Sequence, residues 1–219
     1  MSERTVVHLL RHGKVHNPDG ILYGRLTGYH LSQAGVAMAD AVTDFLRSND
    51  VTYLVASSLL RAQQTAAPIA TSHRLEVVTD DRLLEADNDF AGTSPVGLDG
   101  SLMRPKNWIK LRNPFTPSWG EPYLEIAHRM LAAIYTAVNA AAGHEAVLVS
   151  HQLPIWTVRR FLTGQRLWHN PATRECAVAS LTSLTFVDGV FTEVGYRTPA
   201  AHIAPDDDTP EEAAVKAGA

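Results

Sequence analysis

The chain alternates strand-like and helix-like segments, and this alternation limits the folds that it can adopt. Apolar, β-branched runs cover Thr5–Leu10, Val51–Ala56, Leu75–Thr79 and Ala146–Ser150, and segments with helical spacing cover 32–47, 60–71, 121–142 and 154–162. Two last runs, Ala177–Val187 and Val190–Tyr196, flank Asp188-Gly189, which predicts a hairpin. The pattern predicts an α/β fold: a three-layer sandwich with a mostly parallel central sheet, an antiparallel edge hairpin and helices on both faces.

Single residues mark the ends of the predicted helices. Ser32 is the expected N-cap of the first helix, and Pro154 fits the first turn of the last one. Pro68 leaves the end of the second helix open, because proline removes a backbone donor.

The composition is that of an ordinary globular protein of 219 residues, 45% hydrophobic and 19% charged. We expect one domain over 1–204, with an irregular lid insert over about 92–120, and an acidic, flexible tail over 205–219. The tail holds five acids against one lysine, which accounts for the whole formal charge of -4. The neutral body argues against a nucleic-acid or an acidic-membrane partner, since both need a dominant positive field.

The sequence also suggests where the protein works. No apolar stretch reaches the roughly 20 residues that span a bilayer, and Met1–Arg4 lead straight into a strand rather than into a signal peptide. We therefore expect a cytoplasmic protein without a membrane partner. The single cysteine, Cys176, cannot form an internal disulfide and is expected to be a core thiol.

The periodicity disappears between Gly92 and Gly120. Within this segment nine residues hold four bases and no acid: Arg104, Lys106, Lys110 and Arg112. Long irregular inserts are functional lids or disordered segments, and two tryptophans favour a packed lid. The four bases are candidates to recognise a second anionic or polar group on a substrate, although bases in proline-rich loops are mostly solvated.

Four short motifs follow the strand-like runs. They are Arg11-His12-Gly13, then Ser57-Ser58-Leu59-Leu60-Arg61-Ala62-Gln63-Gln64-Thr65-Ala66, then Leu84-Glu85, and finally Val149-Ser150-His151. In open α/β sheets, ligands collect beyond the carboxyl ends of strands. In this order the motifs resemble the histidine phosphatase superfamily, in the branch that contains the cofactor-dependent phosphoglycerate mutases and many small-molecule phosphatases. The resemblance spans Val6 to Thr185.

The resemblance implies that His12 is the nucleophile of a phosphoryl transfer. A neutral imidazole attacks phosphorus with one nitrogen while the other donates to a backbone carbonyl. Arg11 and Arg61 are the implied phosphate ligands, because a guanidinium binds two oxygens at once and stays ionised. His151 is the implied second histidine that contacts the phosphoryl group. Without the motifs, these residues would be interpreted as core histidines and a surface arginine.

The implied proton donor is Glu85, a role that needs a carboxyl protonated when the leaving oxygen departs. Asp87 and Asp89 lie in the same short segment and compete for the role. The family phosphatases often have Glu-Gly shortly afterwards, where this chain has Ala91-Gly92, which predicts a differently shaped loop.

Several departures from the family bear on the substrate. Lys14 stands where Glu or Gln is usual, Asn17 lies one residue early for the asparagine of the mutases, and Gln152 replaces a common glycine. These differences disfavour a phosphoglycerate mutase, whereas Gly120-Glu121 with Glu125 and Arg129 resembles a stretch of the phosphatase members. The candidate substrate contacts are Lys14, Asn17, Arg25, Arg104, Lys106 and Gln152, with an exposed lysine as the alternative for Lys14.

Other kinds of site are rejected. His8, His12 and His16 recur at intervals of four, a spacing that binds a metal only on a helix, and Gly13 and Pro18 disfavour a helix here. No Gly-x-Ser-x-Gly elbow is present. We therefore predict a phosphomonoester hydrolase without a metal or cofactor, acting on a small phosphorylated metabolite through a phosphohistidine at His12. A mutase, a weakly catalytic phosphate-binding or regulatory protein, and a homodimer stay open as alternatives.

Overall fold

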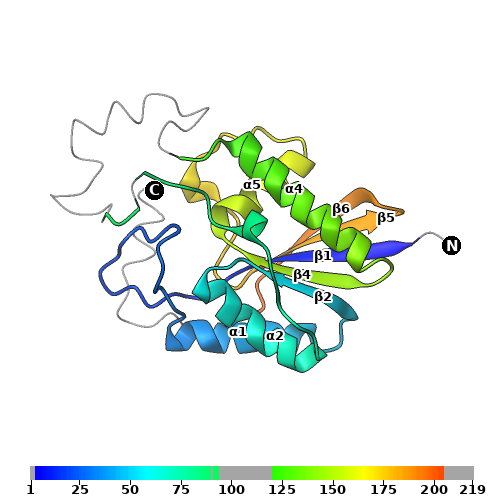
Figure 1. Cartoon of the computed structure of the whole chain (residues 1–219), viewed down its shortest axis with the longest axis horizontal. Helices are drawn as coiled ribbons and strands as arrows, with labels where there is room; N and C mark the ends of the chain where they lie inside the picture. The colour runs from blue at the N-terminus through cyan, green and yellow to red at the C-terminus, as the bar shows by residue number, and fades with distance from the viewer. Residues whose placement is uncertain (1–2, 90, 94–119, 205–219) are drawn as a thin grey trace.

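A six-stranded sheet forms the centre of the computed structural model, which describes residues 3–89, 91–93 and 120–204. The strands are β1 (Arg4–Arg11), β2 (Val51–Ala56), β3 (Val78–Thr79), β4 (Glu145–Ser150), β5 (Leu181–Val187) and β6 (Val190–Arg197), in the spatial order β3-β2-β4-β1-β5-β6 (Figure 1). The first four are parallel, and β5 and β6 add an antiparallel edge. The predicted mostly parallel sheet with an edge hairpin is confirmed.

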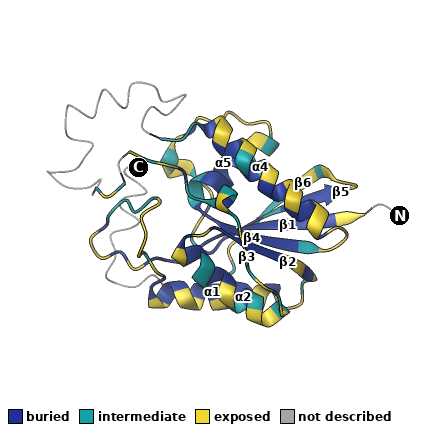
Figure 2. Ribbon diagram, in the orientation of Figure 1, coloured by how far each residue is buried: buried dark blue, intermediate teal, exposed yellow. Residues whose placement is uncertain are grey.

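Helices cover both faces of this sheet. One face carries α1 (Gln33–Leu46) and α2 (Leu60–His73), and the other carries α4 (Tyr123–Ala140) and α5 (Gln152–Leu162). Side chains alternate along β1, so Leu10 packs with the first pair of helices and Leu9 with the second. Figure 2 shows the buried strands between helices whose outer faces are exposed. The three-layer architecture is confirmed.

No helix in the described part of the chain is long and apolar enough to cross a bilayer.

Some predicted boundaries are wrong, for local reasons. The helix α2 runs through Pro68 to His73 and ends where Arg74 adopts a left-handed conformation (φ 56°). The following strand β3 is therefore reduced to two residues rather than five. The strand β5 begins at Leu181 instead of Ala177, because Ala179 has a positive φ of 54° and its N–H donates to the carbonyl oxygen of His12.

The register of the parallel strands brings three chain segments to one edge. Arg11 pairs with Ser150, and Ala56 pairs with Val149, so β1, β2 and β4 end side by side. The backbone N–H of His12 donates to Ser150 O, and that of Ser57 donates to Val149 O. We call this edge the carboxyl edge of the sheet. Three of the four sequence motifs meet there.

Two glycines let the start of α1 approach the loop after β1. Ser32 is the N-cap of α1, as predicted, and its Oγ accepts from the N–H of Gly35. A Cβ on Gly35 would lie 1.9 Å from the carbonyl oxygen of Lys14, and one on Gly13 would lie 2.5 Å from the carbonyl oxygen of Gly35. Both contacts are with backbone, which cannot rotate away.

Gly35→Ala should therefore destabilise the fold. Alanine favours a helix over glycine by about 1 kcal/mol, but overpacking against a backbone costs about 1–3 kcal/mol or more. We expect the free energy of unfolding to fall by about 2 kcal/mol, measured by urea denaturation. Gly195→Ala is the matched control, because nothing lies within 4 Å of the added Cβ. Equal stabilities of the two variants would contradict the close approach.

Candidate functional site

His12 lies at the carboxyl edge, directly after β1, and is almost completely buried. Its Nδ1 is 2.8 Å from the carbonyl oxygen of Gly13. A carbonyl oxygen only accepts, so Nδ1 carries the proton and Nε2 keeps its lone pair. Burial lowers the pKa of the His12 imidazole well below its ordinary value, and the positive charges of Arg61 and Arg11 lower it further. The ring is therefore a neutral imidazole with one nitrogen available as a nucleophile.

His151 follows β4 and is the neighbour of His12, with ring centroids 5.1 Å apart. Its Nε2 is 2.9 Å from Ser57 Oγ, and its Nδ1 is buried and has no hydrogen-bond partner among the described residues. Burial lowers the pKa of His151 well below its ordinary value, with Arg61, His12 and Arg11 adding to the effect. A buried polar atom without a partner is costly and rare, so Nδ1 marks a place that a ligand can satisfy.

Two buried guanidinium groups provide the positive charge. Arg11 is 7% exposed and Arg61 is 1% exposed. Arg11 donates to the carbonyl oxygen of Cys176 (2.8 Å), and Arg61 donates to that of Gly24 (2.6 Å). Both contacts use neutral acceptors, so the charges are oriented without being neutralised by them. The Nε of Arg11 is also buried, and no described residue accepts its hydrogen.

Tyr23 forms an aromatic wall that the sequence analysis missed. The Arg61 guanidinium lies 4.7 Å from the centroid of its ring, and the ring meets His12 edge-on at 6.4 Å. Tyr29 stacks on it at 5.0 Å. No periodicity or motif marks these tyrosines. Ser57, in contrast, could have been found, because it follows β2 directly within a quoted motif.

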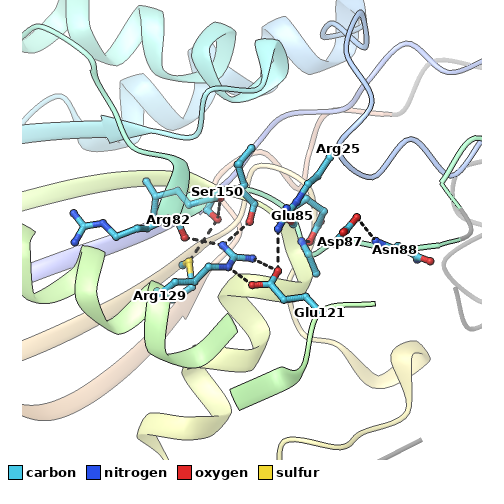
Figure 3. A network of polar contacts seen from close by, with 12 residues as sticks. Arg25, Arg82, Glu85, Asp87, Asn88, Glu121, Arg129 and Ser150 are labelled. Atoms are coloured by element: carbon cyan, nitrogen blue, oxygen red, sulfur yellow. Dashed lines mark hydrogen bonds and ion pairs between the residues drawn. The ribbon is translucent and has the colours of Figure 1, made fainter. Parts of the chain in front are cut away.

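Glu85 is half-buried and lies in a loop that is fastened to the carboxyl edge. Ser150 Oγ donates to Leu83 O (2.7 Å), and the Arg129 guanidinium donates to Leu84 O (2.7 Å). Arg25 Nε donates to the carbonyl oxygen of Glu85 itself (2.7 Å). Figure 3 shows these contacts around Glu85. The loop is therefore held by side chains from three separate parts of the chain.

Glu121 binds both of the arginines, Arg25 and Arg129, that hold the Glu85 loop. Both of its carboxylate oxygens accept from Arg129, at 2.6 and 2.9 Å, and one also accepts from Arg25 at 3.0 Å (Figure 3). The stretch Gly120-Glu121…Arg129, noted in the sequence for its resemblance, thus fixes the position of the Glu85 loop. Arg25 is also engaged here, and its role as a substrate contact stays a prediction.

The competing carboxylates face elsewhere. Asp87 and Asp89 are exposed, and together with Arg25, Glu121 and Glu125 they line a cavity of about 460 Å³. The charge of Glu85, in contrast, raises the pKa of Cys176, the residue whose carbonyl oxygen accepts from Arg11. Burial raises the pKa of the Cys176 thiol to about 11, with Glu85 contributing, which fits a core thiol. Glu85 stays the predicted proton donor, with Asp87 and Asp89 as the alternatives.

The other predicted contacts lie in different places. Lys14 is buried beside His12, so the alternative of an exposed lysine is wrong. Asn17 is buried and binds the backbone of Ile21 through both its amide oxygen and nitrogen. Gln152 accepts from Arg174. The bases Arg104, Lys106, Lys110 and Arg112 lie outside the described residues.

The three histidines at intervals of four do not converge. His8 bonds Ser183 and Glu145, His12 bonds Gly13, and His16 stacks on His30 with ring centroids 5.4 Å apart.

Comparisons with known proteins identify the family of the chain. A model of the histidine phosphatase superfamily (branch 1) matches residues 7–198, and the chain belongs to this superfamily, whose members are phosphatases or mutases. An uncharacterized protein of Mycobacterium tuberculosis is 55% identical over 201 residues, which cover 92% of this chain and 100% of the relative. A probable phosphoglycerate mutase of Yersinia enterocolitica is 32% identical over 163 residues, 72% of this chain and 74% of the relative.

Solved structures are similar over nearly the whole chain. The mycobacterial glucosyl-3-phosphoglycerate phosphatase has a TM-score of 0.69 and 26% identity, and the match covers 90% of this chain and 97% of that one. A Bacillus stearothermophilus protein, YhfR, has a TM-score of 0.75 at 22% identity, covering 91% of this chain and 100% of that one, and shows the fold alone.

The neutral histidines should make the protein less stable in mild acid. The unfolded chain binds protons on both imidazoles as the pH falls through about 6.5, whereas the folded protein does not. The free energy of unfolding should therefore fall below pH 6.5, by at most about 1.4 kcal/mol per pH unit for each histidine, until the pH reaches the folded-state pKa. His169, whose pKa burial lowers to about 4, adds a third contribution.

His151→Gln should reduce this slope by one histidine's share between pH 6.5 and 5, measured by urea denaturation. The exposed His128, changed to Gln, is the control and should leave the slope unchanged. A slope in His151→Gln equal to that of the unsubstituted protein would mean that His151 already carries a proton in the folded state.

Proposed function

We propose that this protein is a phosphomonoester hydrolase that works through a phosphohistidine on His12. The observation that carries the proposal is the arrangement around that ring. Its Nδ1 is bound to Gly13 O, which leaves Nε2 as the nucleophile. Beside it lie Arg11 Nε and His151 Nδ1, two buried atoms that have no hydrogen-bond partner among the described residues. A phosphoryl group would supply an acceptor oxygen for Arg11 Nε, and one for His151 Nδ1 in the tautomer that carries its proton there.

The reaction proceeds in two displacements. In the first, the lone pair of His12 Nε2 attacks phosphorus, the bond to the ester oxygen breaks, and Glu85 gives that oxygen its proton. Arg11, Arg61 and His151 bind the equatorial oxygens as their charge is redistributed. In the second, water attacks the phosphohistidine, Glu85 accepts a proton from the water, and the nitrogen–phosphorus bond breaks to release inorganic phosphate. The chemistry uses only groups of this chain and needs no metal or cofactor.

A mutase shares the first displacement and differs in the acceptor of the second. The 32% identity to a probable phosphoglycerate mutase favours this second candidate. The hydrolase is preferred because Gly120-Glu121 and Arg129, which resemble the phosphatase members, hold the donor loop here. The likeness to a glucosyl-3-phosphoglycerate phosphatase, also solved with VO3, points the same way. A small phosphorylated metabolite is the proposed substrate.

His12→Ala should abolish turnover, lowering kcat by about three orders of magnitude or more on any phosphate ester. Incubation of the unsubstituted protein with a labelled ester should trap an acid-labile phosphoenzyme on a denaturing gel, and His12→Ala should trap none. The exposed His16, changed to Ala, is the control. Label retained by His12→Ala would exclude His12 as the nucleophile.

Glu85→Gln should separate substrates by their leaving groups. An alkyl phosphate needs protonation of its leaving oxygen, so its kcat should fall by about 100-fold or more. An activated aryl phosphate needs little protonation and should lose only a few-fold. Asp87→Asn and Asp89→Asn are the matched controls. Equal losses on both substrates in Glu85→Gln, with a selective loss in one aspartate variant, would transfer the donor role to that aspartate.

A further inference from the structure

Arg174 is a half-buried guanidinium that the phosphoryl chemistry above does not use. It lies just after the short helix η3 (Pro171–Thr173) and two residues before Cys176, whose carbonyl oxygen accepts from Arg11. The pKa of Arg174 depends on some of the same groups. Burial lowers this pKa, the negative charge of Glu85 raises it, and the positive charge of Arg11 lowers it. Arg174 therefore borders the proposed site on the side of Glu85 and Arg11.

The orientation of Arg174 is fixed by neutral acceptors. Its Nε donates to His169 Nε2 at 2.9 Å, and its NH1 donates to Gln152 Oε1 at 3.3 Å. His169 must accept at Nε2, because its Nδ1 donates to Leu167 O at 2.7 Å. Burial lowers the pKa of His169 to about 4, so this ring stays neutral. Both contacts aim the guanidinium without balancing its charge.

In the part of the chain that the structure describes, no carboxylate lies within ion-pair distance (4.0 Å) of Arg174. A guanidinium has five N–H groups, and the two contacts use one on Nε and one on NH1. The others are directed to no described partner. An oriented cation that borders a reaction site and lacks a close anion is the arrangement that binds one.

Gln152, which contacts Arg174, is one of the positions where the sequence departs from the family pattern. It follows His151 directly, where the family commonly has glycine, and its Oε1 is an anchor that glycine cannot provide. The same substitution that disfavoured a phosphoglycerate mutase thus orients a further cation, beyond Arg11 and Arg61, next to the phosphoryl site.

We propose that Arg174, positioned by Gln152 and His169, binds a carboxylate on the substrate, so that the enzyme prefers small phosphate monoesters that carry a carboxylate. The planar fork of a guanidinium matches the two oxygens of a carboxylate. Before the first displacement Glu85 is protonated and carries no negative charge. In this state the substrate carboxylate provides the negative charge that pairs with Arg174. This inference rests on the proposed function.

Two esters that differ in one group test it: 3-phosphoglycerate carries a carboxylate where glycerol 3-phosphate carries a hydroxymethyl group. Dissociation constants are measured by calorimetry in the His12→Ala background, which removes turnover. We expect 3-phosphoglycerate to bind roughly ten- to hundredfold more tightly, as a charge-assisted hydrogen-bonded pair allows. Arg174→Gln should bring the ratio of the two constants close to one, and Gln152→Ala should lower it part of the way.

The exposed Arg166, changed to Gln, is the control for a general loss of positive charge. Unfolding temperatures check that each variant folds. A ratio near one before any substitution, a ratio unchanged by Arg174→Gln, or no binding of 3-phosphoglycerate would overturn the inference. These results are independent of whether the unsubstituted protein hydrolyses either ester, which tests the proposed function.

Turnover of the His12-containing protein distinguishes binding from donor orientation. If Arg174 binds the substrate carboxylate, Arg174→Gln should raise KM for 3-phosphoglycerate much more than for glycerol 3-phosphate. If Arg174 only orients Glu85, kcat should fall equally for both esters, and the inference would be wrong.

Discussion

The pairing of β1 with β4 is the constraint on which the rest of the site depends. Because Arg11 pairs with Ser150, the residues that follow, His12 and His151, leave the sheet side by side. A shift of one residue would turn every side chain of β1 to the opposite face of the sheet. Each side chain would then face the hydrophobic cluster on the wrong side. The strand pairing therefore fixes where the two histidines leave the sheet, and the contacts of His12 with Gly13 and of His151 with Ser57 orient their rings.

The site concentrates buried positive charge, and its neighbours keep that charge usable. Arg11 and Arg61 donate to backbone carbonyls, and Arg174 donates to a neutral imidazole and an amide. A carboxylate in each of these places would compete with an anionic substrate for the same donors. Glu121, by contrast, forms ion pairs with both Arg129 and Arg25, and these two arginines fasten a loop. The fold thus separates arginines that hold structure from arginines that are oriented for an anion.

Much of this fold could be predicted from local sequence, and the reasons are specific. The apolar runs of β1, β2 and β4 are continuous because both faces are buried, and Asp188-Gly189 marks the hairpin of β5 and β6. Arg11, His12, Arg61 and His151 could be named because each belongs to a motif at the end of a strand-like run. The short strand β3 and the late start of β5 could not be predicted, since both depend on left-handed residues, Arg74 and Ala179, whose side chains do not require that conformation. Tyr23 and Arg174 were missed because only tertiary contacts bring them to the site.

The contacts around Glu121 have a consequence for how such a protein can change over evolution. Asn88 forms a bridge with Gly120, and the N–H of Glu121 donates to Asp87 O, so two positions that are distant in the sequence are clamped side by side. When the two ends of a segment are already held together, doubling its length costs only about 0.6 kcal/mol of closure entropy. The sequence between Asn88 and Gly120 can therefore change in length at little cost in closure entropy. The clamp thus lets insertions and deletions accumulate between these two positions during evolution while the register of the sheet stays the same.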